Sequence, residues 1–240
     1  MRHASLFSGI GGFDLAAQWM GWENVFQVEI DPFCQKVLQK NFQLTKRYGD
    51  IRTFNSIHYR GLLDIVTGGF PCKQTSVSAA IHKKRHGLQG VDSSLWHEQI
   101  RVLKDCAPTW AIVENVSGVE KWENEIKSGL EGIGYTVSKL EFKACGFGLP
   151  HERRRCLYVA NAHSKRLEIP RRPDAPTTEW FKRLAVDGGS WLTGTPGTIG
   201  ILNGLPHRVD RIRSLGNALI PHIAHQIFQA IEKVDLLPTL

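Results

Sequence analysis

Short β-branched or aromatic runs alternate along this chain with amphipathic stretches, and this alternation restricts the fold more than any other feature. Strands separated by helices are typical of a parallel sheet with crossover connections. The expected strands are residues 4–8, 25–30, 64–67, 110–114, 136–142 and 156–161. The expected helices are residues 12–20, 32–41, 94–106, 123–133 and 217–233. We therefore predict an α/β fold, with a mostly parallel sheet and helices on both of its faces.

Residues 163–202 interrupt the alternation because they are rich in Pro, Gly, Thr and Arg. We interpret them as a small second lobe or a long insertion. The expected organisation is a main domain over residues 1–162, this lobe over 163–202, and a segment over 203–240 that returns to the main domain. A chain of 240 residues with 42% apolar residues is long enough for one such domain with a small attachment.

The formal net charge is +7, and residues 151–240, with 13 basic and 8 acidic side chains, contribute +5 of it. This bias suits a polyanionic partner, although it also occurs in ordinary soluble proteins. The chain contains no apolar run near the ~18 residues of a membrane span, and no apolar signal-peptide segment at its start. Five widely spaced cysteines without a C-x-x-C pair indicate neither a disulfide framework nor a zinc site. We expect a soluble cytoplasmic protein without a metal.

The segment SLFSGIGGFD, residues 5–14, joins an expected strand to an expected helix through a Gly-rich turn. Such a turn brings backbone amides and a helix N-terminus close to a ligand. Asp14 stands where the third glycine of a pyrophosphate-binding G-x-G-x-x-G would be. Glu29 ends the next strand, where a carboxylate can hold ribose hydroxyls, and Asp50 ends the third unit, where it can accept from an adenine amino group. Together they favour an adenosine-containing cofactor; the alternatives are a purely structural turn and acids that cap helices or face solvent.

The segment GGFPCKQTS, residues 68–76, directly follows an apolar strand. Pro71 restricts its own φ and the conformation of Phe70, so Cys72 is expected on a rigid loop at the carboxyl edge of the sheet. Lys73 beside it favours the thiolate, which indicates a nucleophile rather than a buried spectator. We interpret the other cysteines as packing residues: Cys34, Cys106, Cys145 and Cys156.

Two further motifs end or begin strands. The apolar strand in WAIVENVSG ends at Glu114, whose burial would help it retain a proton to donate; the alternative is a loop that caps the next helix. In LPHERRRCLYVA, extended backbone places Arg153 and Arg155 on one side and Arg154 on the other. Two guanidinium groups on one side can bind a substrate oxygen and a phosphate, or they are simply an exposed charge cluster.

Over nearly its whole length the chain resembles the DNA (cytosine-5)-methyltransferase family, in its bacterial or phage form. SLFSGIGGF resembles the cofactor loop of that family, GGFPC its nucleophile loop, ENV its catalytic acid motif and HERRR its arginine motif. RSLGNALIP, residues 213–221, resembles the closing motif whose Asn returns to the cofactor. Five motifs in the order of the family are not expected by chance. The resemblance implies the Rossmann-like fold of S-adenosylmethionine-dependent methyltransferases, with S-adenosylmethionine as the cofactor.

The resemblance also implies roles for individual residues. Cys72 would attack carbon 6 of a flipped-out cytosine, Glu114 would bind its exocyclic amine and N3, and Arg155, with Arg153 nearby, would hold O2. The implied cofactor residues are Phe7, Ser8, Gly9, Ile10, Gly11, Gly12, Glu29, Ile30, Asp50, Ile51, Pro71, Leu95, Asn217, Ala218 and Leu219. No metal is implied, because the sulfonium methyl is already activated. The implied partners are double-stranded DNA and a restriction endonuclease that acts separately. The resemblance also implies a monomer that lies in the cytoplasm of a prokaryotic cell, near the nucleoid.

The chain departs from the family pattern at three places. Lys73 and His151 each replace a Gln that is usual in the family. Only residues 163–202 are left for target recognition, so we expect recognition of a short site or a contribution from the IHKKRHGLQG segment, residues 81–90. This short region keeps an RNA methyltransferase of the same chemistry open as an alternative. A silent DNA-binding relative and a nicotinamide-dependent oxidoreductase are the other two alternatives.

Overall fold

The computed structural model describes residues 1–71, 95–116, 120–143, 154–162, 210, 214 and 218–236. Within these ranges the strands are β1 (Arg2–Leu6), β2 (Glu23–Val28), β3 (Lys46–Tyr48), β4 (Ile65–Gly68), β5 (Trp110–Val116), β6 (Thr136–Lys143) and β7 (Arg154–Asn161). The helices are α1 (Gly12–Trp19), α2 (Pro32–Asn41), the 3-10 helix η1 (Ile57–Tyr59), α4 (Leu95–Cys106), α5 (Glu120–Glu131) and α8 (Pro221–Leu236). None of the described helices is long and apolar enough to cross a membrane.

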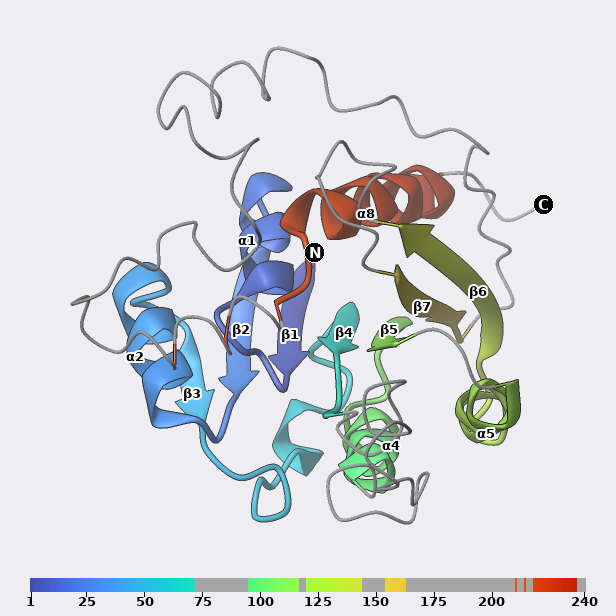
Figure 1. The fold of residues 1–240 in the computed structure, drawn as a ribbon, viewed down its shortest axis with the longest axis horizontal. Helices are drawn as coiled ribbons and strands as arrows, with labels where there is room; N and C mark the ends of the chain where they lie inside the picture. The colour runs from blue at the N-terminus through green and yellow to red at the C-terminus, as the bar shows by residue number, and fades with distance from the viewer. Residues whose placement is uncertain are drawn as a thin grey trace.

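The strands form one sheet in the order β3-β2-β1-β4-β5-β7-β6 (Figure 1). Strands β1 to β5 pair in parallel, and β7 runs antiparallel to both β5 and β6. The order reverses between β1 and β4, where Leu6 at the end of β1 lies opposite Gly68 at the end of β4. The carboxyl ends of strands at such a reversal are the usual ligand site of an open α/β sheet. The predicted α/β fold class with a mostly parallel sheet is confirmed.

Alternating side chains of the central strands supply two separate cores. In β4, Ile65 belongs to the cluster formed with α1 and α8, whereas Val66 belongs to the cluster formed with α4. This is the period of two expected for an extended strand with both faces buried. Figure 1 shows α1 and α8 on one side of the sheet and α4 on the other, as the prediction of helices on both faces requires.

A buried polar network links the sheet to α1 beneath the Gly-rich loop. His3 Nδ1 lies 2.6 Å from Oδ1 of Asn24, while Ser5 Oγ and Gln27 Nε2 donate to Asp14 over 2.9 and 3.0 Å. Burial raises the pKa of Asp14 and lowers the pKa of His3, because each charged form would be removed from water. Asp14, which replaces the third glycine of a pyrophosphate loop, therefore anchors the start of α1 to the sheet.

Two elements differ from the sequence prediction. Strand β3 was not expected, because Lys46–Tyr48 is short and partly basic; its pairing with β2 makes it a strand. The last helix begins at Pro221 and not at residue 217, and the described residues 218–220 precede it without helical structure. Proline fits the first turn of a helix because the N–H groups of that turn have no acceptor within the helix, so no hydrogen bond is lost.

Candidate active site

The turn between β1 and α1 requires glycine for reasons of both conformation and space. Gly9 and Gly11 have φ values of 56° and 88°, and the amide of Gly11 donates to the Ser8 carbonyl over 2.9 Å. A Cβ on Gly11 would lie 2.5 Å from Cε2 of Phe42, and a Cβ on Gly12 would lie 2.7 Å from the carbonyl oxygen of Leu219. The turn is therefore packed closely between α2 and the segment that leads into α8.

Replacing Gly11 by Ala is expected to lower the free energy of unfolding by roughly 2–5 kcal/mol. The new methyl group adds an unfavourable φ and an overlap with the buried Phe42 ring. Gly21→Ala is the matched control, because Gly21 has a φ of 71° but nothing within 4 Å of a built Cβ. Urea unfolding of both variants separates the two contributions: equal losses would show that the contact with Phe42 does not matter.

Glu29, directly after β2, lies against the Gly-rich turn. Its Oε2 accepts from the Gly9 amide over 2.7 Å, and its Oε1 accepts from the Asp31 amide over 2.8 Å. Burial raises the pKa of Glu29, although these two amides partly offset the effect. The next side chain, Ile30, is 61% exposed at the same edge of the sheet. The structure thus brings together the first two cofactor features that the sequence indicated.

Asp50 lies on the turn after β3, and its carboxylate is bound by Arg52. The ion pair measures 2.6 Å between Oδ2 and Nη2, and hydrogen bonds from Arg52 hold the pKa of Asp50 below its usual value. Ile51 is buried in the core cluster on the α4 face. The amide of Glu29 donates to the Tyr48 carbonyl over 3.0 Å, which joins the ends of β2 and β3 and places this turn at the same edge as Glu29. The sequence analysis did not identify Arg52 as the partner of Asp50. The only signal in the sequence is that Arg52 follows Asp50 by two residues.

The segment that leads to Cys72 leaves β4 at the reversal point of the sheet. A Cβ on Gly69 would lie 2.7 Å from Oε2 of Glu114, so the backbone of this segment packs directly on the expected catalytic acid. Phe70 is buried against Trp96 of α4, with ring centroids 5.5 Å apart. The described part of this segment ends at Pro71, so Cys72 and Lys73 lie outside the described ranges. A side chain at the second glycine of GGFPC would therefore displace the carboxylate of Glu114 from its present position.

Glu114 and Arg155 face each other across β5 and β7. The antiparallel register pairs Val116 with Arg155, so the guanidinium reaches back along β5, and its Nε lies 2.7 Å from Oε1 of Glu114. Both side chains are largely buried, with exposed fractions of 13% and 21%. Arg154 is exposed, as the expected alternation of Arg154 and Arg155 requires. Arg153 and His151 lie outside the described ranges.

The closing motif lies over the Gly-rich turn. Leu219 is buried in the cluster of α1 and α8 and touches Gly12 through its carbonyl group. Ser214 Oγ lies 3.4 Å from Cys34 Sγ of α2, so the motif contacts the second helix as well. Ala218 is half-buried, and Asn217 lies outside the described ranges. Leu95, another expected cofactor residue, is the first residue of α4 and packs on the core of that face.

Three of the cysteines that the sequence assigned to packing are buried, namely Cys34, Cys106 and Cys156. Burial raises the pKa of Cys106 to about 12 and that of Cys156 to about 11. These two thiols stay protonated at neutral pH and are poor nucleophiles. Their assignment as packing residues agrees with this environment, and Cys145 lies outside the described ranges.

Comparison with known proteins relates these features to one family. The model of the C-5 cytosine-specific DNA methylase family matches residues 1–184. Type II methyltransferase M2.BsuMI of Bacillus subtilis is 33% identical over 170 residues, which cover 67% of this chain and 42% of that protein. Type II methyltransferase M.AquIA of a Picosynechococcus species is 30% identical over 199 residues, which cover 73% of this chain and 77% of that protein.

The solved structure of the Entamoeba histolytica methyltransferase EhMeth shares the fold, with a TM-score of 0.72 over 99% of both chains at 15% identity. The chain spans less than half the length of M2.BsuMI. Its family model nevertheless covers most of the chain and all the described residues from the Gly-rich turn to Arg155. The chain therefore belongs to the C-5 cytosine-specific DNA methylase family.

Proposed function

We propose that this chain transfers a methyl group from S-adenosylmethionine to carbon 5 of a cytosine flipped out of double-stranded DNA. The observation that carries the proposal is the contact between the Gly69 backbone and the carboxylate of Glu114, which Arg155 holds from the other side. The loop that leads to Cys72 thus lies directly beside an acid and a guanidinium. A nucleophile, an acid and an oxygen-binding cation are the groups that addition to a cytosine ring needs.

The described residues around the Gly-rich turn suit S-adenosylmethionine. The half-buried Glu29 carboxylate would accept hydrogen bonds from the ribose hydroxyls, in place of the one that it accepts from the Gly9 amide. Asp50 would accept from the adenine amino group, and the exposed Ile30 offers an apolar surface beside it. The other proposed cofactor residues are Phe7, Ser8, Ile10, Gly11, Gly12, Ile51, Pro71, Leu95, Asn217, Ala218 and Leu219. When bound, the cofactor supplies a methyl group activated by its sulfonium.

In the proposed reaction the thiolate of Cys72 adds to carbon 6 of the flipped cytosine. Glu114 hydrogen-bonds the exocyclic amine and N3, which offsets the charge that develops as the ring loses its aromaticity, and Arg155 binds O2. Arg153 would lie nearby. Carbon 5 becomes nucleophilic and would take the methyl group as the bond from that group to the sulfonium sulfur breaks, which leaves a neutral thioether. Loss of the proton from carbon 5 and departure of the Cys72 thiolate then restore the ring.

Bisulfite sequencing of plasmid DNA from cells that express the protein tests the proposal. We expect 5-methylcytosine in one short sequence context, and none in cells with an empty vector. Transfer of labelled methyl groups in vitro to duplex DNA and to tRNA separates the two polynucleotides. Methylation of tRNA alone would replace the proposed substrate, and no transfer to either would overturn the proposed activity.

Four expectations drawn from the resemblance accompany this proposal. We propose that the chain acts as a monomer, that residues 163–202 contribute to target recognition, and that a separate restriction endonuclease recognises the same site. We also place the protein in the cytoplasm of a prokaryotic cell, where its DNA substrate lies.

Lys83, Lys84 and Arg85, which lie outside the described ranges, are expected to bind DNA phosphates. Replacing all three by Ala should flatten the slope of log K against log salt by up to about 3 units, because each phosphate contact releases close to one counterion. Exposed Lys36 and Lys40 of α2 provide a control double variant, for which we expect almost no change in slope.

Fluorescence anisotropy on one duplex over a series of salt concentrations measures this slope. The methylated sequence should stay the same in the triple variant, since phosphate contacts position a protein whereas contacts with base edges specify sequence. A slope equal to that of the wild type would assign the segment to a solvated surface, and a changed target would show that it contacts bases.

A further inference from the structure

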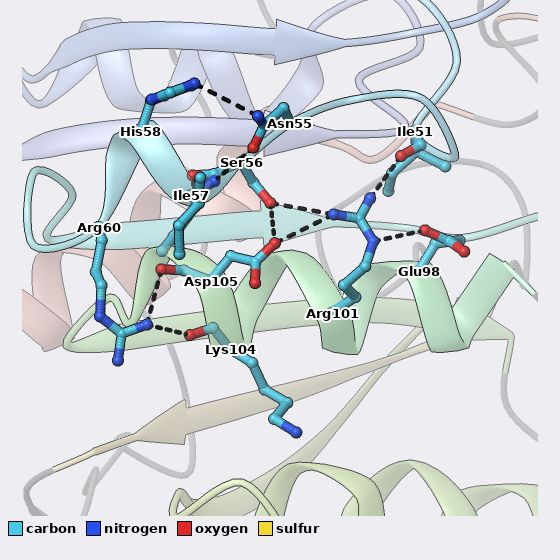
Figure 2. A network of polar contacts seen from close by, with 11 residues as sticks. Ile51, Asn55, Ser56, Ile57, His58, Arg60, Glu98, Arg101, Lys104 and Asp105 are labelled. Carbon is cyan, nitrogen blue, oxygen red and sulfur yellow. Dashed lines mark hydrogen bonds and ion pairs between the residues drawn. The ribbon is translucent and has the colours of Figure 1, made fainter.

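Arg101 of α4 ties the turn that carries Asp50 and Ile51 to that helix. Arg101 Nη2 donates to the carbonyl oxygen of Ile51 over 2.7 Å. The same guanidinium donates through Nη1 to Ser56 Oγ over 3.3 Å. Arg101 therefore bonds to both ends of the segment from Ile51 to Ser56. Figure 2 shows the side chain extending from α4 between these two acceptors. No motif in the sequence singled out this arginine.

Acidic side chains orient the guanidinium. Glu98, one turn earlier on α4, accepts from Arg101 Nε over 2.8 Å, and Asp105, one turn later, accepts from Nη1 over 3.2 Å. Asp105 also accepts from the fully buried Ser56 hydroxyl over 2.6 Å. The planar guanidinium therefore has fixed partners on each edge, an arrangement that the single ammonium of a lysine cannot reproduce.

The carbonyl that Arg101 binds belongs to the turn beside the proposed adenosine site. That oxygen also accepts from the Phe54 amide over 3.3 Å, and the Thr53 amide donates to the Asp50 carbonyl over 3.1 Å, so the turn forms a compact hydrogen-bonded unit. Ile51 itself is 3% exposed and packs in the core with α4 residues. Motion of the Ile51 carbonyl would shift the adjoining peptide and the carboxylate of Asp50 with it.

We propose that Arg101 is a positioning residue for the cofactor, which holds the Asp50–Ile51 turn in the conformation that binds the adenine end of S-adenosylmethionine. This inference rests on the proposed function. Arg101 does not touch the cofactor; it raises the fraction of molecules whose turn is already in the binding conformation. The apparent dissociation constant rises in inverse proportion to that fraction when the tie is removed.

Calorimetric titration of the full chain with S-adenosylmethionine tests the proposal, together with steady-state kinetics on duplex DNA. For Arg101→Ala we expect roughly a tenfold higher Kd and KM for the cofactor, since a hydrogen bond from a charged donor to the turn is lost. The value of kcat at saturating cofactor should stay within about twofold of wild type, because the reacting groups are untouched. Arg101→Lys should restore part of the affinity.

Arg60→Ala is the matched control. Arg60 also donates to main-chain carbonyls, those of Lys104 and Asp105 at the end of the same helix, over 3.1 and 3.2 Å (Figure 2). The Arg60→Ala variant is expected to have a Kd for the cofactor within about twofold of that of the wild type. An equal rise in Kd for both variants, or an unchanged Kd with a lower kcat for Arg101→Ala, would overturn the positioning role. Failure of the wild-type chain to bind the cofactor would instead overturn the proposed function.

Discussion

Replacement of Cys72 by Ser is expected to abolish methyl transfer while leaving the affinity for S-adenosylmethionine nearly unchanged. The far higher pKa of a hydroxyl leaves almost no oxyanion to attack carbon 6 of cytosine. The preceding segment is anchored independently of the sulfur, because Phe70 is buried against Trp96. Transfer of a labelled methyl group to duplex DNA measures the loss, and calorimetry measures the binding. Substantial residual turnover would contradict the assignment of the nucleophile.

Cys34→Ser is the matched control for this experiment. Cys34 is a buried thiol on α2, and its Sγ lies 3.4 Å from the Ser214 hydroxyl, so a serine can keep a hydrogen bond there. We expect the control to retain the rate of methyl transfer. A duplex with 5-fluorocytosine at the target provides a second measurement. Release of the enzyme requires loss of a proton from carbon 5, and the fluorine that replaces this proton cannot be lost in the same way. Mass spectrometry should find a covalent complex with the wild type and with Cys34→Ser, but none with Cys72→Ser.

Replacement of Glu114 by Gln is expected to lower kcat by roughly 10²-fold or more. The amide keeps the size of the carboxylate that packs on Gly69, so the segment leading to Cys72 should keep its path. The amide removes the charge that pairs with Arg155 over 2.7 Å, and, unlike a carboxylate, it cannot take up a proton and pass it to the cytosine. Single-turnover transfer at saturating cofactor and DNA measures the change in rate.

The control for the acid is Glu123→Gln. Glu123 also forms an ion pair, with Lys139 over 2.5 Å, and its side chain is 20% exposed, similar to the 13% of Glu114. It lies on α5, and its replacement should leave the rate unchanged. If Glu114→Gln also leaves the rate unchanged, Glu114 has a structural role beneath the Gly69 segment. Cofactor affinity, measured for both variants, shows whether either replacement disturbs the site as a whole.

The sheet could be predicted wherever a strand carried its own local signal. Residues 65–68 and 110–113 are mostly apolar and buried on both faces, so their sequences alone indicate central strands. Strand β3 had no such signal, because β-propensity in a short, partly basic strand depends mainly on its neighbours. The start of α8 was placed too early, since the predicted helix included residues before Pro221, the residue at which the structure begins the helix.

The sequence alone determined which chemical groups the site contains, because turns, strand ends and proline braces depend on neighbouring residues. It placed the Gly-rich turn and Glu29 at the ends of strands, where the structure also has them, but β5 continues past Glu114 to Val116. Only the tertiary structure decided which groups meet. The contact of Gly69 with Glu114, the pair of Glu114 with Arg155, and the tie from Arg101 to the Ile51 carbonyl join segments far apart in the chain. Such contacts depend on the order and register of the strands and on how α4 packs against them, and local periodicity encodes none of these.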